Sequence, residues 1–267
     1  MVLRAIIENI NLMFPYKTKD KSNKIFVVVN GKQKELRRKI KGLDVIFAAK
    51  SKKNIIILHM PLRFKDTTIK VKGVNGKIVI ESSKDAINQA HILIDDYSEI
   101  YIGKNSRITM PNLKLKVNNA CKDHSVKLII GENVQIGEDV IIRTSDGHSI
   151  FKLGEDKPFN APRDVIIGDN VWLGERVVVL KGSNIPSNTI VGSCALINKK
   201  FTEENTIIAG VPAKVVKRDV YWKRANYAKL IQDKSKTLAK TDNLKNVIKQ
   251  AIIKKIKYRI KKSLFLH

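Results

Sequence analysis

The sequence predicts an all-β fold: a left-handed parallel β-helix solenoid with one extruded loop, an irregular N-terminal region and a basic α-helical extension at the C-terminus. Two observations carry the prediction, a six-residue repeat of aliphatic residues and the glycines that follow it. The repeat runs through Ile130, Ile136 and Ile142 and, after one interruption, through Ile167, Leu173, Val179, Ile185, Val191 and Ile197. Glycine follows it at Gly131, Gly137, Gly168, Gly174 and Gly192.

The period of six predicts the shape of the core. The period does not match that of a helix. The two-residue alternation of a flat sheet explains why the period is even but not why it is six. It fits a three-sided prism in which each side is one short parallel strand and a complete coil takes about 18 residues. Gly and Asn supply tight turns or positive φ at the corners, and β-branched residues suit stacked strands. The left-handed coil is an exception to the usual right-handed crossover, and a sandwich of alternating strands is the rival fold.

The repeat is interrupted from 143 to 164, where the sequence reads RTSDGHSIFKLGEDKPFNAPRD. Solenoids accept insertions at their corners, and such loops tend to carry function. We therefore predict a β-helix at 66–217 with its extruded loop at 143–164, preceded by residues 1–65 and followed by 218–267. Residues 1–65 are interpreted as a cap or as irregular first coils. Within them, NKIFVVVNGKQKEL predicts a strand and an Asn30-Gly31 turn, and NIIILHM predicts a buried strand.

The C-terminal extension is strongly basic. Its apolar residues recur every four positions among lysines, which predicts an amphipathic helix: Ile248, Ile252, Ile256, Ile260 and Leu264. Three roles are open. The helix packs on a subunit or caps the solenoid, lies on an anionic membrane surface, or binds nucleic acid. Nucleic acid is the weakest of the three, because no aromatic residues are interleaved with the charges.

Composition narrows the class of protein. Lys+Arg 51 against Asp+Glu 25 gives a net charge of +26, which favours polyanionic partners without choosing among them. The 2 cysteines, Cys121 and Cys194, form no C-x-x-C motif, so a cysteine-based zinc or redox site is not expected. No run of 18 apolar residues predicts a membrane span, and Glu8 and Asn9 break the apolar N-terminus. We expect a cytoplasmic protein, in contact with the inner membrane face if the basic helix binds there.

Four motifs resemble one family. They are SDGHSIF (145–151), DVIIGDNVWLG (164–174), VLKGSNIPSNTIVGS (179–193) and IIAGVPAKVVK (207–217). In this order and spacing they resemble the hexapeptide-repeat acyltransferases, most closely the galactoside and capsular polysaccharide O-acetyltransferases. The resemblance implies acetyl-CoA as cosubstrate, no metal, and a homotrimer with active sites between subunits. It covers about residues 128–222.

The resemblance assigns His148 as the catalytic base. An imidazole has an ordinary pKa of about 6.5, close to working pH, and is suited to remove the proton of a sugar hydroxyl. His148 matches the family's catalytic histidine, 24 residues before Trp172. Asp146 is a candidate to orient the imidazole, although it also suits a turn before Gly147. No covalent nucleophile is expected.

The remaining assignments concern the two substrates. The resemblance implies that Trp172 shapes the acceptor site. It also implies that the backbone of Gly174 and Glu175 contacts the acetyl-CoA cosubstrate, with an N–H at this corner stabilising the oxyanion. A further set is predicted to contact coenzyme A: Ser193, Asn198, Lys199, Lys214 and Lys217. Asn118 and Asn119 are predicted to contact the acceptor from a neighbouring subunit.

Rival functions use the same fold. A γ-type carbonic anhydrase would bind zinc through three histidines, but His91, His124 and His148 are not spaced by the coil period. A non-enzymatic glycan-binding solenoid would not need the DGH and VWLG elements. N-acetylation of an amino-sugar nucleotide, or O-acetylation of serine or an antibiotic, would keep the chemistry and change the acceptor. The basic tail favours a large anionic glycan, and we expect O-acetylation of a bacterial capsule or lipopolysaccharide.

Overall fold

The structure is a computed structural model that describes residues 20–36 and 38–225. These residues form β-strands and connecting turns, and no α-helix occurs among them. Residues up to Trp222 belong to one compact unit and those from Lys223 to a second. The helix predicted in 218–267 therefore falls mostly outside the described residues, and positions 218–225 are irregular.

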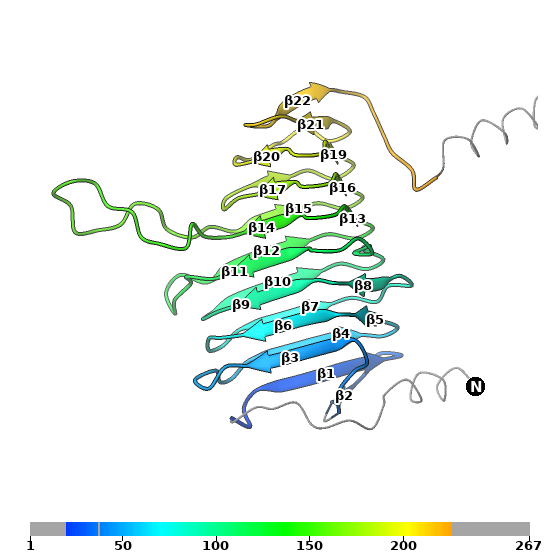
Figure 1. The fold of residues 1–267 in the computed structure, drawn as a ribbon, viewed down its shortest axis with the longest axis vertical. Coiled ribbons are helices and arrows are strands. Elements are labelled where there is room, and N and C mark those ends of the chain that lie inside the picture. The colour runs from blue at the N-terminus through cyan, green and yellow to red at the C-terminus, as the bar shows by residue number, and fades with distance from the viewer. Residues whose placement is uncertain (1–19, 37, 226–267) are drawn as a thin grey trace, which may run out of the picture. The chain divides into compact units, whose positions relative to one another are not determined.

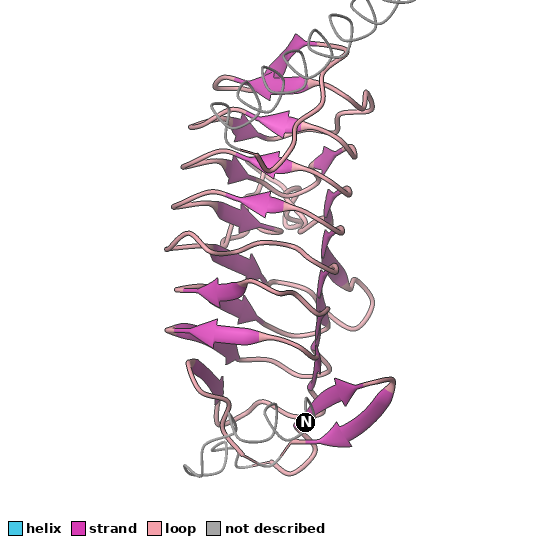
Figure 2. Ribbon diagram, turned by 90° about the vertical axis from the view of Figure 1, so that its right-hand side faces the viewer, coloured by secondary structure: helices cyan, strands magenta, loops and turns pink. Residues whose placement is uncertain are grey.

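The strands form the three faces of a coil that repeats along the chain (Figures 1 and 2). The first face is an eight-stranded sheet of β1 (Lys24–Val29), β2 (Lys32–Glu35), β4 (Ile55–His59), β7 (Lys77–Ile80), β10 (Ser98–Ile102), β12 (Val126–Ile130), β15 (Val165–Ile167) and β18 (Asn184–Ile185). The second face holds β5 (Arg63–Lys65), β8 (Ala86–Asn88), β13 (Gln135–Ile136), β16 (Trp172–Leu173), β19 (Ile190–Val191), β21 (Ile207–Ala209) and β22 (Lys214–Lys217). The third face holds β3 (Leu43–Phe47), β6 (Thr67–Val71), β9 (His91–Ile94), β11 (Lys114–Val117), β14 (Ile141–Arg143), β17 (Val178–Val179) and β20 (Leu196–Ile197).

Successive coils pair in parallel and in the register that the repeat predicts. Ile167 of β15 pairs with Ile185 of β18, and Leu173 of β16 pairs with Val191 of β19. All nine repeat residues from Ile130 to Ile197 are at most 1% exposed, so each sixth residue points into the prism. The predicted three-sided parallel coil is confirmed in these respects, and its left-handed sense stays a prediction.

The corners between strands have the positive φ and the close stacking that their Asn, Asp and Gly residues predict. Asn133, Asp139, Asn170 and Asn188 adopt positive φ of 56°, 55°, 53° and 59°. Asn and Asp tolerate this left-handed conformation better than other side chains. At Gly131 a Cβ atom would lie 2.7 Å from the carbonyl carbon of Gly168, because equivalent corners of neighbouring coils stack closely.

Residues before 66 belong to the same prism. β4 pairs in parallel with β7, and β3 pairs in parallel with β6. The boundary placed at residue 65 is therefore not a break between sheets, since the described part of 1–65 supplies regular first coils. The predicted turn is present: Asn30 and Gly31 have φ of 50° and 75° and join β1 to its antiparallel partner β2. A second antiparallel strand, β22, ends the second face. Both cover the edge of a parallel stack.

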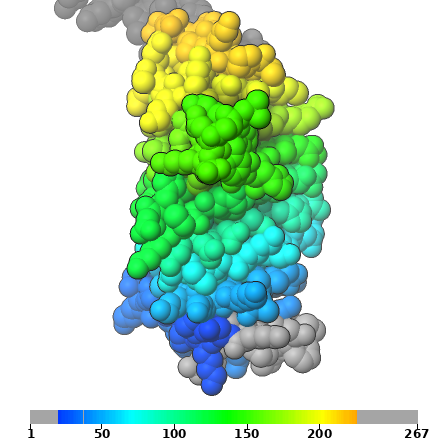
Figure 3. All heavy atoms as spheres, turned by 90° about the vertical axis from the view of Figure 1, so that its left-hand side faces the viewer, coloured from blue at the N-terminus to red at the C-terminus, as the bar shows by residue number. Residues whose placement is uncertain are grey.

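One long segment leaves the prism, between the end of β14 and the start of β15. Residues 144–164, hereafter the loop, extend sideways from the edge where the third face meets the first (Figure 1). Seen from that side, the loop stands out from the surface of the coils (Figure 3). Its apolar residues are solvent-exposed within the single chain, at Ile150, Phe151, Leu153 and Phe159.

The burial pattern gives a test on two adjacent isoleucines of β15. Ile167 is fully buried, whereas Ile166 is 40% exposed. Ile167→Ala removes axial methyl groups and should lower the free energy of unfolding by about 2–5 kcal/mol, as in other buried large-to-small changes. Ile166→Ala, the matched control, should cost far less. Urea unfolding followed by circular dichroism measures both, and equal losses would contradict a core built on the repeat residues.

Candidate active site

The loop is closed at its base by backbone hydrogen bonds. The amide of Arg163 donates to the carbonyl of Thr144 at 2.9 Å, and the amide of Phe159 donates to Ile150 at 3.0 Å. At the turn, the amide of Gly147 donates to Ser145 Oγ at 3.0 Å, and Gly147 has a φ of 96°. The segment carrying His148 is therefore fixed by local geometry at the third–first edge.

The two arms at the base of the loop, residues 144–150 and 159–163, are hereafter called the neck, and Asp146 anchors the neck to the next coil. Its carboxylate pairs with the Nζ of Lys181, which lies at the corner after β17, and accepts a hydrogen bond from Asn160 Nδ2 at 2.8 Å. Lys181 Nζ also donates to the carbonyl of Asn160 at 2.8 Å, and the Lys181 side chain is only 12% exposed. Burial raises the pKa of the Asp146 carboxyl, but the hydrogen bonds from Lys181 and Asn160 and the charges of Lys181 and Arg143 outweigh it. The pKa therefore lies below its ordinary value of 3.8.

His148 is exposed on this neck. Its carbonyl oxygen accepts a hydrogen bond from Asn160 Nδ2 at 2.8 Å, so its backbone is held by the same cluster. Within the described residues, its imidazole makes no hydrogen bond or ion pair. The contacts of Asp146 are with Lys181 and Asn160 and not with the imidazole, which differs from the predicted orienting pair. Asp146 fixes the neck from which the ring projects.

Trp172 lies on the opposite side of the coil. The loop leaves the edge between the third and first faces, whereas Trp172 belongs to β16 on the second face (Figure 1). Trp172 is 42% exposed, and its ring packs against that of Trp222 with the centroids 5.9 Å apart. A single chain therefore does not bring His148 and Trp172 together.

The Gly174-Glu175 corner follows Trp172 at the edge between the second and third faces. A Cβ atom on Gly174 would lie 2.7 Å from the backbone nitrogen of Ser193, so these two predicted residues are neighbours on adjacent coils. The carboxylate of Glu175 points to Arg176 Nη2 at 2.8 Å. In the part of the chain that the structure describes, the Glu175 N–H donates to no acceptor, which leaves it available to an external oxygen.

The predicted coenzyme A residues lie in two separate regions of the prism. Asn198 and Lys199 follow β20 on the third–first edge, one coil beyond Lys181, and Lys199 Nζ lies 5.2 Å from the Phe201 ring centroid. Lys214 and Lys217 lie on β22, at the end of the second face, and are exposed. Ser193 and the lysines of β22 thus lie on one side of the prism, and Asn198 and Lys199 on the other.

Asn118 and Asn119 lie on the third–first edge, one coil before the loop. The amide of Asn118 donates to Thr144 Oγ1 at 3.4 Å, and Asn118 Nδ2 donates to Asn119 Oδ1 at 3.0 Å. The Oδ1 of Asn118 is buried and has no hydrogen-bond partner among the described residues. The third–first edge therefore carries Asn118, Asp146, His148, Lys181 and Lys199 in successive coils.

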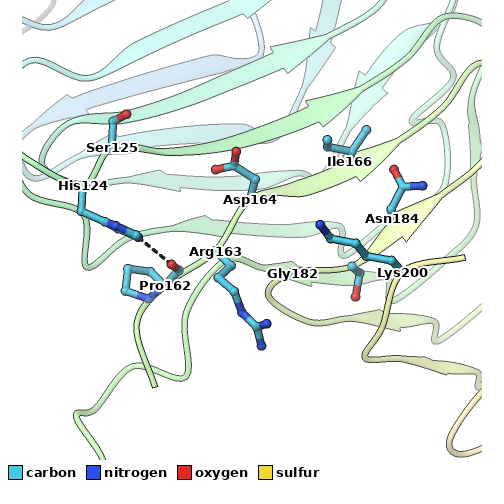
Figure 4. A pocket seen from close by; sticks show the side chains of 10 residues that line it. His124, Ser125, Pro162, Arg163, Asp164, Ile166, Gly182, Asn184 and Lys200 are labelled. Carbon is cyan, nitrogen blue, oxygen red and sulfur yellow. Dashed lines mark hydrogen bonds between the residues drawn. The ribbon is translucent and has the colours of Figure 1, made fainter. Parts of the chain in front are cut away.

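A depression of about 410 Å³ lies beside this edge on the first face. It is lined by Arg163 and Lys200 together with Asp164, whose Oδ1 accepts from the Lys127 amide at 2.8 Å (Figure 4). His124 closes one end, with its Nε2 2.8 Å from the carbonyl oxygen of Pro162. Neither the depression nor the contacts of Lys181 could be predicted from the sequence, because residues of one edge are separated along the chain by whole coils.

The three histidines of the carbonic anhydrase hypothesis do not share a location. His91 lies on β9, His124 contacts the returning arm of the loop, and His148 lies on its outgoing arm. Across residues 20–36 and 38–225, no group of three His, Cys, Asp or Glu side chains is placed to hold a metal ion. Nor is any helix of the described residues long and apolar enough to cross a membrane.

Comparisons with known proteins identify the family. No protein-family model matches the chain. The chain is 32% identical over 198 residues to a polysialic acid O-acetyltransferase of Neisseria meningitidis, covering 61% of this chain and 92% of that enzyme. It is 34% identical to a polysialic acid O-acetyltransferase of Escherichia coli O1:K1, but over 104 residues, which span 39% of this chain and 34% of that protein.

Two solved structures of polysialic acid acetyltransferases are similar to this chain. The polysialic acid acetyltransferase NeuO aligns over 85% of this chain and 96% of its own, with a TM-score of 0.66 and 25% identity. The polysialic acid O-acetyltransferase OatWY aligns over 70% and 90%, with a TM-score of 0.52 and 26% identity. The chain belongs to the hexapeptide-repeat O-acetyltransferases, and the family that its motifs predicted is confirmed.

The ion pair between Lys181 and Asp146 predicts that removing the ammonium changes the pKa of Asp146. In Lys181→Met the ammonium is lost while burial remains, so the pKa of Asp146 should rise. In the wild type, the stability contributed by this carboxylate is present above the unfolded pKa and is lost as the pH falls through the lowered folded value. Carbon-13 NMR of labelled aspartate measures the shift.

The control is Lys152→Met, which removes an ammonium that pairs with Glu155 farther out on the loop. It should leave the titration of Asp146 unchanged. An unaltered pKa in Lys181→Met would show that Lys181 does not determine the charge state of the neck.

Proposed function

We propose that the protein transfers the acetyl group of acetyl-CoA to a hydroxyl of an acidic bacterial surface glycan, with polysialic acid as the first candidate. The match that spans 92% of the meningococcal polysialic acid O-acetyltransferase carries this proposal. The net charge of +26 supports an acceptor with a carboxylate on each sugar, because the field of the protein attracts such a polymer.

His148 is the proposed general base. Its imidazole takes the proton of the sugar hydroxyl as the hydroxyl oxygen attacks the thioester carbonyl. The imidazolium then returns this proton to the departing coenzyme A thiolate. One C–O bond forms and one C–S bond breaks, so no covalent enzyme intermediate is needed. A positioned base of this kind contributes about 10²–10⁴-fold to the rate.

Asp146 is proposed to support His148 indirectly. Its ion pair with Lys181 and its hydrogen bond with Asn160 hold the neck, and Asn160 in turn holds the carbonyl of His148. This replaces the predicted contact of Asp146 with the ring, because the carboxylate is already engaged.

The Gly174-Glu175 corner is proposed to stabilise the oxyanion through the Glu175 N–H, which has no acceptor among the described residues. Coenzyme A carries phosphates, which suit the exposed ammonium groups of Lys199, Lys214 and Lys217. Ser193 and Asn198 are proposed to contact its pantetheine arm. Trp172 is proposed to form one wall of the acceptor site, and Asn118 and Asn119 to contact the sugar.

The active site is proposed to lie between subunits of a homotrimer. His148 and Trp172 project from opposite sides of the prism, so one copy's loop must meet another copy's second face. The exposed apolar side chains of the loop, among them Phe151 and Leu153, suit a place against a neighbouring copy. We also propose a cytoplasmic site of action, with the basic extension at the inner membrane face.

N-acetylation of an amino-sugar nucleotide remains the alternative, because the donor chemistry would be the same. A non-enzymatic glycan-binding role is less well supported, since the relatives are transferases. Locating the new acyl group on the product by NMR, as an ester or as an amide, distinguishes the first two.

His148→Ala should reduce acetyl transfer from acetyl-CoA to polysialic acid by about 10²–10⁴-fold, because the proton acceptor is lost. Assembly and coenzyme A binding should be unchanged in sedimentation and calorimetry. His91→Ala, an exposed histidine on β9, is the control and should keep wild-type activity. Substantial activity in His148→Ala would remove His148 from the mechanism.

Mixed oligomers test the shared site. Co-expression of His148→Ala with Trp172→Ala should recover up to about a quarter of wild-type activity, since random assembly places an intact His148 beside an intact Trp172 in that fraction of interfaces. Each variant alone should be inactive or weak. If co-expressed oligomers showed no more activity than the mean of the two parents, the residues would not act across an interface.

A further inference from the structure

A second tryptophan reaches the candidate acceptor site from the end of the described chain. Residues 218–222, hereafter the strap, follow β22 and lie against earlier coils. Arg218 donates from Nε and Nη2 to the carboxylate of Glu203 at 2.6 and 3.1 Å, and the Val220 amide donates to Asn205 at 3.0 Å. These bonds fix the strap upstream of Trp222.

Trp222 is held on two sides. Its indole N–H donates to the carbonyl of Asn170 at 2.7 Å, and its ring meets the ring of Trp172 at 5.9 Å between centroids and a tilt of 46°. Asn170 precedes Trp172 by two residues, and its own backbone and side chain bond to Glu132 and Asn188. The carbonyl that anchors Trp222 is thus part of the rigid corner that leads into β16.

The contact restricts Trp172 without covering it. Trp172 remains 42% exposed, whereas Trp222 is partly buried. An exposed indole on a strand otherwise exchanges between rotamers, and ordering it at the moment of binding weakens affinity. A tilted aromatic neighbour removes part of that freedom beforehand.

We propose that Trp222 is a positioning residue, which holds the Trp172 indole in the orientation that the acceptor sugar meets. The inference rests on the proposed function of Trp172. It assigns a role in acceptor recognition to the strap, a segment beyond the last coil, and it makes Trp222 act through Trp172 rather than on the reacting atoms.

The chain has only 2 tryptophans, which makes the test direct. Trp222→Ala and Trp222→Phe each leave Trp172 as the sole tryptophan. Time-resolved fluorescence anisotropy should show a more mobile Trp172 in Trp222→Ala than in Trp222→Phe, which retains a ring. Equal mobility in both variants would overturn the proposal.

Kinetics with acetyl-CoA and polysialic acid supply the second readout. Trp222→Ala should raise the KM for polysialic acid by about tenfold, and Trp222→Phe by less, because an aromatic contact is worth about one factor of ten. The KM for acetyl-CoA should not change. Val216→Ala, at an exposed position on β22 just before the strap, is the control and should behave as wild type.

The outcomes separate this inference from the proposed function. A change in KM for Trp172→Ala but not for Trp222→Ala would overturn the inference alone. No change in either variant would overturn the proposed role of Trp172 and, with it, the inference. If the wild type does not acetylate polysialic acid, the proposed acceptor fails, and the anisotropy comparison still decides whether Trp222 orders Trp172.

Discussion

The in-register pairing of successive coils is the constraint on which the rest of this structure depends. Each strand satisfies its backbone hydrogen bonds on the coils before and after it, and each repeat residue stacks on its equivalent, as Ile167 does on Ile185. A shift by one residue would turn the aliphatic side chains out of the prism. The chain can therefore accept extra residues only at a corner, where the insertion leaves the stack sideways. The loop that carries His148 is such an insertion, and the coils on both sides continue in register across it.

A largely buried lysine connects this insertion to the prism. Lys181 belongs to the coil after the loop, yet its ammonium reaches back to Asp146 and to the carbonyl of Asn160. The free-energy cost of removing the ammonium from water is offset by the Asp146 carboxylate and the Asn160 carbonyl, which are held at the same point. Acting together, these groups fix the chain direction at His148, so a histidine that is exposed still has a defined backbone position.

The loop that carries His148 and the face that carries Trp172 illustrate a geometric constraint of the three-sided coil. A loop at one edge and a side chain on the face opposite that edge cannot meet within one prism, whatever their spacing along the chain. His148 and Trp172 are related in this way, and the same geometry divides the predicted coenzyme A residues between two edges. Assembly therefore becomes part of the proposed chemistry, and the strap places Trp222 against Trp172 in one half of the proposed shared site.

The repeat alone determined the coil, the buried residues and the position of the insertion, because a six-residue period is a local pattern that each coil repeats. The Asn30-Gly31 dipeptide predicted the turn between β1 and β2, because turn chemistry acts over two residues. Family resemblance added His148 and Trp172. The sequence left open whether residues 1–65 form a cap or first coils, and the structure shows that residues 24–65 continue the same sheets. Only the tertiary structure gave Asp146 its partners in Lys181 and Asn160, and Trp172 its partner in Trp222. These contacts join residues 14 to 50 positions apart, and their pairing follows from how coils and strap stack, which no local pattern encodes.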